Sequence, residues 1–532
     1  MLTRASLRYY AATNVLVVLG VAVAVAVLGG ALLVGASVRE SLEQIALGRL
    51  GATNAIVTSP TFFRTALAGD LAAKSPGRAM SAAPLIAAGG AVSHEESHRT
   101  AGRVAVYGID ERFGRFHRVD GLTVSGRAAL ISSALASELG AKAGDSITLR
   151  LAKPTDIPLS SLQGRREATG QRIRLTVARV LVRATLGEFS LAPSQGPVLA
   201  IYVPLDRLQR DLDLGDRVNT LLVNGVGDLF SGLSNQQLRN SMTLDDLGIR
   251  TRQGTSDTII ESRAGLITDA LATQIAEIAN RDQRSVTPVL TYVANAIKIG
   301  DREIPYSTVT GIDFRPEAVT APEKTDTRPL IWLNEWAAED LAAKVGDPVT
   351  LEYFLWSDED GLETSSAQFS FAGVVPMSGL GGDPTLTPEY PGISDAADIT
   401  SWDPPFPVDL KRVRKKDEDY WDQYRGAPKA IVTVADAQRL WGSRYGKVSS
   451  LRLSGSALID PQAIDPVSAG LTVRNVRADA MSAAQGTTDF GAYFLYFSFF
   501  LVVSALLLAY LFFAVGLEQR TTEVGVLAAM GF

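Results

Sequence analysis

The sequence contains no cysteine and only three histidines among its 532 residues. The lack of cysteine excludes disulfide frameworks, thiolate nucleophiles and cysteine-based zinc sites, and it leaves the redox compartment open. So few histidines leave little choice for a catalytic triad, and no G-x-S-x-G elbow or G-x-x-x-x-G-K-[ST] phosphate loop occurs. The chain is therefore predicted not to be an enzyme and to hold no cofactor of its own, so that any ATP is bound by a partner subunit.

Charge is also scarce. Charged residues make up 20% of the chain against 46% hydrophobic residues, and the net charge is -6. This is an ordinary globular composition with apolar sequence added, and it gives no reason to expect nucleic acid as a partner. Since one domain usually has ~100 to 200 residues, several folding units are expected.

Two long stretches carry no charge at all. One lies between Arg8 and Arg39, and the other runs from Phe490 to Leu517. About 20 apolar residues at ~1.5 Å each cross a ~30 Å hydrocarbon layer, so both stretches predict transmembrane helices. A signal peptide is the alternative for the first stretch, but a signal has an apolar region of only ~7 to 15 residues. The basic residues Arg4 and Arg8 favour a cytoplasmic start.

The sequence between these stretches is duplicated. The block K-A-G-D-S-I-T-L ends at Leu149 and K-V-G-D-P-V-T-L ends at Leu351, while V-A-V-Y-G-I-D ends at Asp110 and S-T-V-T-G-I-D ends at Asp313. The spacing of about 200 residues indicates two related halves. Each half alternates helical patterns with strand-like segments, which is typical of an α+β fold.

An insertion enlarges the second half at residues 379–428. It is rich in Pro, Gly, Asp and Trp, and such a long irregular segment is more often a surface loop with a binding role than a domain. Its basic run Lys411 to Lys416 is followed at once by Asp417, Glu418 and Asp419. We therefore expect a self-paired charged helix start there rather than a polyanion site.

The segment His94-Glu95-Glu96-Ser97-His98 fits the zincin signature H-E-x-x-H. That signature binds zinc only on a helix, with a third ligand, and here it stands between strand-like segments with only His117 left as a further histidine. A polar hairpin tip is expected, and no metal site is predicted. A membrane-anchored zinc peptidase remains the alternative that a helix across residues 93–99 would favour.

The tail E-Q-R-T-T-E-V-G-V-L-A-A-M-G-F after the second apolar stretch resembles the R-x-x-E-I-G-x-L-R-A-L-G segment of FtsX/MacB-like ABC-transporter permeases. The Lys-x-Gly-Asp blocks are similar to the MacB-like periplasmic core domain. In that family the tail is a coupling helix that docks on the ATPase. The resemblance implies ATPase docking through Glu518, Arg520, Glu523, Val524, Gly525, Leu527, Ala528 and Gly531. Because the family has four or more spans, the chain is expected to be truncated after the second transmembrane helix.

The predicted fold class is a membrane protein with two transmembrane α-helices flanking a large α+β extracytoplasmic region built from two related halves. The expected order is a cytoplasmic N-terminus (1–12), transmembrane helix 1 (13–36), extracytoplasmic half 1 (37–260), extracytoplasmic half 2 (261–489, with the insertion 379–428), transmembrane helix 2 (490–517) and a cytoplasmic coupling helix (518–532).

The resemblance implies a permease subunit of the cell inner membrane, multi-pass, that couples ATP hydrolysis by a separate cytoplasmic ATPase to movement of its extracytoplasmic domain, for export or extraction of a substrate. Its expected partners are the ABC ATPase, a second permease in a homodimer or heterodimer, the lipid membrane, and an extracytoplasmic protein or lipid-like substrate. The alternative is a non-transporting FtsX-like scaffold that regulates an extracytoplasmic partner.

Overall fold

The computed structural model describes residues 2–74, 80–152, 170–193, 196–225, 233–314, 327–357, 361–390, 392–404, 406–485 and 490–531. The chain forms two compact units. The helical unit comprises residues 1–51, 188–197 and 475–532, and the sheet unit comprises residues 52–187 and 198–474.

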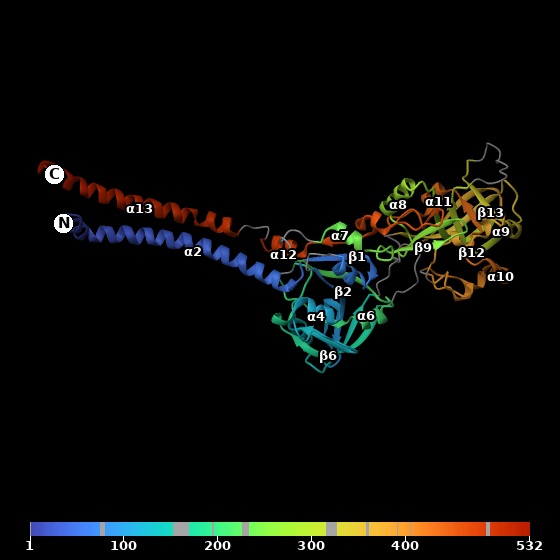
Figure 1. Ribbon diagram of the computed structural model, residues 1–532, viewed down its shortest axis with the longest axis horizontal. Helices are drawn as coiled ribbons and strands as arrows, with labels where there is room; N and C mark the ends of the chain where they lie inside the picture. The colour runs from blue at the N-terminus through green and yellow to red at the C-terminus, as the bar shows by residue number, and fades with distance from the viewer. Residues whose placement is uncertain are drawn as a thin grey trace. The chain divides into compact units, whose positions relative to one another are not determined.

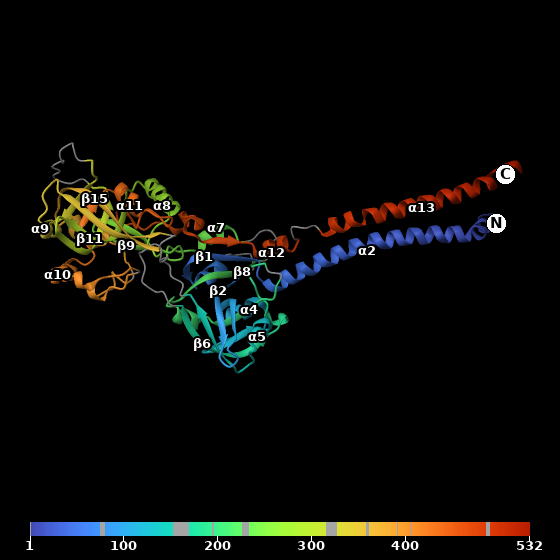
Figure 2. The same cartoon turned by 180° about the vertical axis from the view of Figure 1, so that it is seen from behind.

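The helical unit is built from two long helices that lie side by side, with both chain ends at the same end of the pair (Figures 1 and 2). Each long helix has 40 residues. The ring of Phe512 lies against Gly20, where a Cβ atom would be 3.8 Å from it. The helices of this unit are α1 (Leu2–Tyr9), α2 (Ala11–Leu50), α12 (Val476–Gln485) and α13 (Phe490–Ala529).

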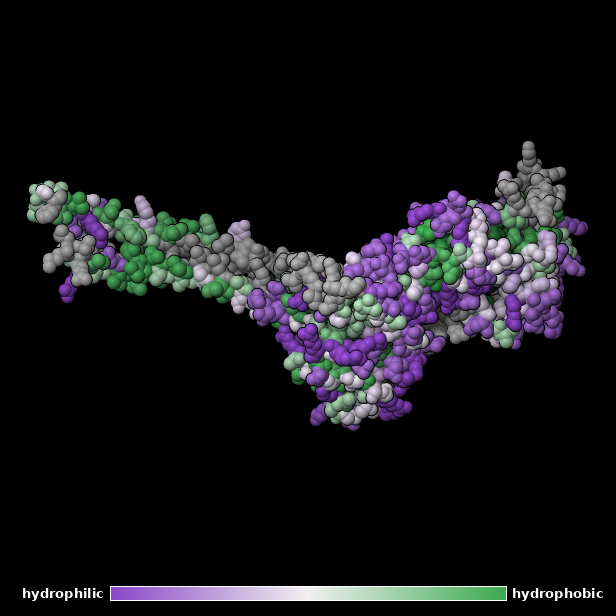
Figure 3. All heavy atoms as spheres, viewed as in Figure 1, coloured by the Kyte–Doolittle hydropathy of each residue, from purple (hydrophilic) through white to green (hydrophobic). Residues whose placement is uncertain are grey.

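The prediction of a membrane protein with transmembrane helices at residues 13–36 and 490–517 is wrong for the described structure. Among the residues that the structure describes, no helix combines the length and the apolar character that crossing a membrane requires. The apolar stretches are parts of longer helices that also carry charged sequence, such as Glu40 and Glu43 in α2. Apolar residues gather along α2 and α13 (Figure 3), and each helix packs along the other. The fold class is therefore corrected to an α+β chain with two large sheets and a pair of long helices.

The first sheet has the strand order β18-β1-β8-β2-β3-β7-β4-β6-β5, and an additional pairing of β2 with β5 closes the strands from β2 to β5 into a ring. Within it β3 is parallel to β7 and β4 is parallel to β6, while the other pairs are antiparallel. The strands are β1 (Ala55–Arg64), β2 (Met80–His94), β3 (Thr100–Ile109), β4 (Ala128–Ser132), β5 (Ser146–Leu151), β6 (Gln171–Leu181), β7 (Ala200–Pro204), β8 (Arg217–Gly225) and β18 (Thr472–Arg474).

The second sheet repeats this arrangement. Its order is β12-β16-β13-β15-β14-β11-β17-β10-β9, closed by pairing of β12 with β11, and its parallel pairs are β12 with β16 and β13 with β15. The strands are β9 (Ile249–Gln253), β10 (Asp257–Ser262), β11 (Val286–Ile299), β12 (Arg302–Ile312), β13 (Leu330–Asn334), β14 (Pro348–Ser357), β15 (Gly361–Val375), β16 (Ala430–Val432) and β17 (Ser450–Ser454).

The repeated Lys-x-Gly-Asp motif forms the same turn in both sheets. The Asp145 carboxylate accepts a hydrogen bond from the Lys142 amide at 2.7 Å, and Asp347 accepts one from the Lys344 amide at 2.8 Å. The glycine between them has φ near +99° in the first turn and +93° in the second, a conformation that favours glycine. The motif therefore recurs because it makes the sharp turn that leads into β5 and β14.

Short helices cover the sheets, and polar side chains start several of them. Ser132 accepts from the Leu135 amide at the start of α5, and Asn334 accepts from the Ala337 amide at the start of α9. The helices of the sheet unit are α3 (Leu67–Ala73), α4 (Glu111–His117), α5 (Ser133–Leu139), α6 (Leu205–Asp211), α7 (Asn235–Ser241), α8 (Asp269–Arg281), α9 (Glu335–Leu341), α10 (Lys415–Tyr424) and α11 (Val434–Trp441).

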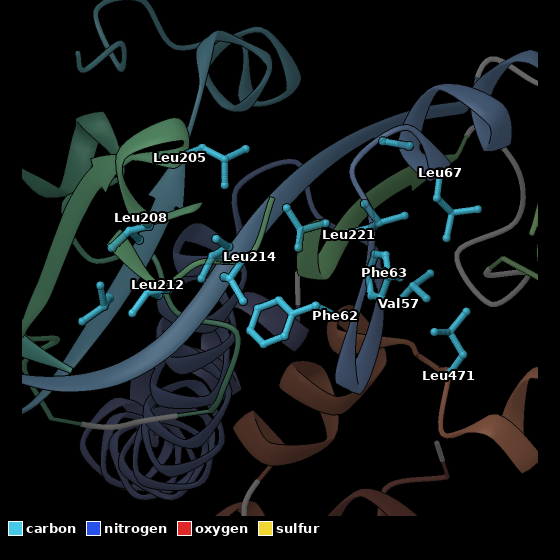
Figure 4. Packing of buried hydrophobic residues seen from close by; sticks show 14 of the residues in the cluster. Val57, Phe62, Phe63, Leu67, Leu205, Leu208, Leu212, Leu214, Leu221 and Leu471 are labelled. Carbon is cyan, nitrogen blue, oxygen red and sulfur yellow. The ribbon is translucent and has the colours of Figure 1, made fainter. Parts of the chain in front are cut away.

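The largest core lies under the first sheet and includes residues from the far end of the chain. Val57 and Phe63 of β1 pack with Leu67, Leu221 and Leu471 (Figure 4). Burial of a side chain such as that of Phe63 stabilises the fold by about 1.5 to 3 kcal/mol. The chain thus returns to the first sheet after completing the second, and there β18 pairs antiparallel with β1.

The insertion at residues 379–428 is packed against the second sheet. Tyr390, Trp402, Phe406 and Trp421 are buried with Tyr306 of β12 in one cluster. The tryptophan rings lie 5.0 Å apart in an edge-to-face arrangement. These aromatic side chains therefore share a small core with residues of the second sheet.

Candidate functional site

The predicted docking residues lie on the last three turns of α13 and just beyond. Glu518, Arg520, Val524, Gly525 and Ala528 are exposed, and Glu523 and Leu527 are half-buried, whereas Gly531 follows the helix with φ near +78°. The structure brings these residues together on one continuous helix. Phe532, the last residue of the predicted segment, lies outside the described residues.

Two of these residues meet the other end of the chain. The Arg520 guanidinium lies over the ring of Tyr10 at 5.5 Å from its centroid. Desolvation and the adjacent Glu523 carboxylate raise the pKa of the Tyr10 hydroxyl. Tyr10 is the residue between α1 and α2, so Arg520 and Glu523 tie the tail of α13 to the start of α2. Sequence reasoning assigned these two residues to a partner and did not foresee this internal contact.

Three apolar side chains of the tail are exposed and are not covered by other residues of the helical unit. Val524, Val526 and Met530 expose more than half of their side chains, at 62%, 55% and 63%. Exposed apolar side chains on a helix, next to the charged residues Arg520 and Glu523, can dock into a groove of another protein.

The opposite end of α2 is fixed by a buried arginine. Arg49 donates to the Gly196 carbonyl at 2.8 Å and forms an ion pair with Glu188 at 3.4 Å. Its own carbonyl accepts from the Ser190 amide at 3.2 Å. Arg49 therefore fastens the end of α2 to the loop at residues 188–197. The sequence analysis missed it, and the only signal was an arginine next to the apolar Leu50 at the end of a helical pattern.

A small apolar pocket lies beside Arg49. It has a volume of about 250 Å³ and is formed by α2, the loop at residues 188–197 and α12. Its walls include Leu42, Ile45, Leu191 and Ala480. The pocket is large enough for a compact apolar group.

The zincin motif does not form. His94 ends β2, the next three residues make a turn, and His98 has φ near +54°, so the two histidines do not share a helix face. Glu95 pairs with Arg174 at 2.5 Å. His117 lies in α4, where its Nδ1 accepts from the Ala52 amide at 3.1 Å and burial lowers its pKa to about 4. The expected hairpin tip is confirmed, and the geometry of a zincin is absent from these described residues.

A buried lysine directly follows the insertion and faces its charged helix α10. Lys429 is buried, with its ammonium 3.6 Å from Asp417 Oδ1 and above the rings of Trp336 and Tyr420 at 4.5 and 4.7 Å. Burial lowers the pKa of Lys429 to about 8. Burial opposes ionisation of Asp417 as well, but Arg414 and Lys429 outweigh it and hold the Asp417 pKa below its usual range. The predicted self-pairing of the basic run is confirmed for Arg414 with Asp417 and Lys415 with Asp419, whereas Lys416 pairs with Asp340 of α9.

The fold thus has two copies of an α+β arrangement, each with a closed sheet, and a pair of long helices. Residues 15–229 match the family model described as the MacB-like periplasmic core domain. The match confirms the resemblance of this part of the chain to FtsX/MacB-like ABC-transporter permeases, and it supports a component of a transporter of that type.

Two solved structures are similar in part. The periplasmic region of MacB from Actinobacillus actinomycetemcomitans is 11% identical, covers 36% of this chain and 84% of its own, and has a TM-score of 0.24. The extracellular domain of the noncanonic ABC-type transporter YknZ from Gram-positive bacteria is 14% identical, covers 33% of this chain and 84% of its own, and has a TM-score of 0.23. No curated protein matches the chain.

Proposed function

We propose that this chain is the permease subunit of an ABC transporter of the FtsX/MacB type at the cell inner membrane. In this proposal a separate cytoplasmic ATPase docks on the tail of α13, and its ATP hydrolysis moves the extracytoplasmic sheet unit to export or extract a substrate. The observation that carries the proposal is the match of residues 15–229 to the MacB-like periplasmic core domain. The exposed Val524 and Met530 beside Arg520 and Glu523 support the docking site.

The connections of the chain support a mechanical role. Three stretches join the helical unit to the sheet unit: α2 leads into β1, the loop at residues 188–197 lies between β6 and β7, and β18 leads into α12. Arg49 ties the first two of these stretches together. A displacement of α2 is therefore passed to β1 and to the β6–β7 connection at the same time, and not through one flexible link.

The test is co-purification of the ATPase with the intact protein. A variant with Val524→Asp and Met530→Asp places carboxylates at two exposed apolar positions of the tail, so it should lose the ATPase that the wild type retains. Glu111→Lys is the matched control, because Glu111 is an exposed residue of α4 in the sheet unit. Retention by the double variant, or no ATPase with the wild type, would count against the proposal.

A second assay separates docking from transmission. Arg49→Met should leave the ATPase bound, because Arg49 lies at the far end of α2 from the tail, but it should uncouple ATP hydrolysis from transport. Coupling is measured as substrate moved per ATP hydrolysed in reconstituted vesicles. Unchanged coupling in this variant would contradict the transmission step.

The same preparation tests the assembly. We propose that two permease chains associate, as a homodimer or a heterodimer, and that the substrate outside is a protein or a lipid-like molecule. Light scattering of the purified complex gives the number of chains.

The scaffold alternative predicts instead that a cell-wall enzyme co-purifies with the intact protein and that no substrate is moved. The buried aromatic residues of the insertion, including Trp402 and Phe406, are not available to bind such a partner.

A further inference from the structure

The tip of the β2–β3 hairpin faces the Lys-Ala-Gly-Asp turn of the first sheet. His94 is only 3% exposed, and its amide donates to the Arg99 carbonyl at 2.9 Å, which closes the hairpin. Its imidazole points to Asp145, the residue whose carboxylate caps the turn before β5. The backbone of His94 is therefore fixed by the hairpin, and its side chain lies between the hairpin and the turn.

The hydrogen bonds of Ser97 involve one nitrogen of the imidazole. The Ser97 hydroxyl donates to the Leu139 carbonyl at 2.7 Å. Its oxygen lies 2.9 Å from His94 Nδ1, and the Ser97 amide donates to the same nitrogen at 3.4 Å. Ser97 therefore occupies Nδ1, and Nε2 is the ring nitrogen left for another partner.

The free nitrogen Nε2 faces a negative charge. His94 Nε2 lies 3.3 Å from Asp145 Oδ2, is buried, and has no hydrogen-bond partner among the described residues. A buried ring nitrogen that faces a carboxylate needs a proton or a cation between the two groups. The candidates are a proton on Nε2 and a metal ion.

The surroundings favour a metal ion. The Glu96 carboxylate joins the other two groups, and one ligand atom each from His94, Glu96 and Asp145 lies within 4.8 Å of the others. Two ligands of a tetrahedral ion with bonds of about 2.0 to 2.1 Å are about 3.4 Å apart, close to the Nε2 to Oδ2 separation. The Nδ1 hydrogen bond to Ser97 is the kind of outer contact that orients a metal-bound histidine.

We propose that His94, Glu96 and Asp145 form a site for a divalent transition-metal ion, with Zn²⁺ as the cation that one imidazole and two carboxylates suit. The ion joins the β2–β3 hairpin to the turn before β5, and water completes its coordination. This ligand set differs from the zincin pair, because it uses Glu96 and Asp145 in place of Glu95 and His98. The site belongs to the sheet unit and is independent of ATPase docking.

The second half supplies an internal comparison. Its Asp347 caps the same turn, but the adjoining strand β11 ends at Ile299 and the following turn, Gly300-Asp301, has no histidine. The turn therefore forms without a metal in one copy, so the proposed ion is an addition specific to the first copy.

The experiment is Zn²⁺ titration of the full chain after chelation and dialysis, with a competing fluorescent chelator as the readout. Wild type should bind one Zn²⁺ per chain, Glu96→Gln should bind at least tenfold more weakly, and His94→Gln should not bind at the site. Glu96 is exposed, so its variant tests the site without disturbing the core.

Two matched controls complete the test. Asp347→Asn changes the equivalent turn and His98→Gln changes the other hairpin histidine, and both should bind like the wild type. Equal binding by Glu96→Gln and wild type would overturn the proposal, as would loss of binding in His98→Gln. Failure of the wild type to bind Zn²⁺, with ¹⁵N NMR showing a proton on His94 Nε2, would assign the contact to a direct hydrogen bond with Asp145 and overturn the proposal.

Discussion

Replacement of Lys429 by methionine should stabilise the second half of the sheet unit near neutral pH. Lys429 is buried against Trp336 and Tyr420, and burial lowers its pKa from 10.5 to about 8. The nearby Asp417 keeps its two hydrogen bonds from Arg414, at 2.8 and 2.7 Å, when the ammonium is removed. The substitution therefore removes a costly buried charge without leaving the carboxylate unpaired.

The magnitude follows from the pKa shift. The folded state binds fewer protons than the unfolded state between the two pKa values, so the free energy of unfolding rises with pH in this window. The full effect is about 3 kcal/mol, and about 2 kcal/mol of it falls between pH ~7.5 and ~9.5. Lys429→Met has no proton to lose, so it should be more stable by about 3 kcal/mol at pH ~7.5, and the difference from wild type should shrink as pH rises.

The assay is urea unfolding followed by tryptophan fluorescence at several pH values, kept below pH ~10, where ordinary tyrosines begin to ionise. Lys415→Met is the control, because the side chain of Lys415 is 83% exposed and its removal should change stability by less than about 0.5 kcal/mol. A less stable Lys429→Met variant at neutral pH would refute the reasoning. So would a wild-type curve that runs parallel to the variant curve across the window.

Three further predictions follow from buried groups. Burial lowers the pKa of His117 to about 4, so the ring stays neutral in the folded state while it takes up a proton in the unfolded state. The free energy of unfolding should therefore fall by about 3 kcal/mol as the pH drops from 6.5 to 4. His117→Gln should remove this part of the pH dependence in acid unfolding. Arg49→Met removes the contacts to Glu188 and Gly196, so it should cost about 2 kcal/mol and speed proteolysis within residues 188–197; unchanged cleavage would contradict the fastening role. Trp402→Ala empties part of the insertion core, so calorimetry should show a loss of about 3 to 5 kcal/mol, whereas a surface loop would tolerate it.

The duplication could be predicted from the sequence because the repeated motif forms its turn through contacts within four consecutive residues. Lys-x-Gly-Asp recurs since the turn needs a glycine at positive φ and a carboxylate that accepts from the backbone at Lys142 and Lys344. The hairpin tip at His94 and the self-paired basic run also depend on neighbours in sequence. Such features can be predicted from a short window of residues.

Contacts between distant residues could not be predicted in this way. Arg49 pairs with Glu188, and His94 lies next to Asp145. The residues of each pair are far apart in the sequence, and the local sequence around one gives no sign of the other. The insertion reads as a loop because its tryptophans are spaced irregularly, and only the fold shows that they share one core. The expectation of transmembrane helices rested on apolar length alone, which does not distinguish a span from a long helix with a helical partner.

The return of β18 to β1 has a consequence for synthesis. Residues 472–474 leave the ribosome after every strand of the second sheet, yet they form the edge of the first. The second sheet has all its strands, and can close, before the first receives its last one. Leu471 likewise reaches the older core only then. The nascent chain therefore carries a first sheet with an open edge at β1 throughout the translation of the second, and the backbone groups of that edge stay unpaired by β18 until then.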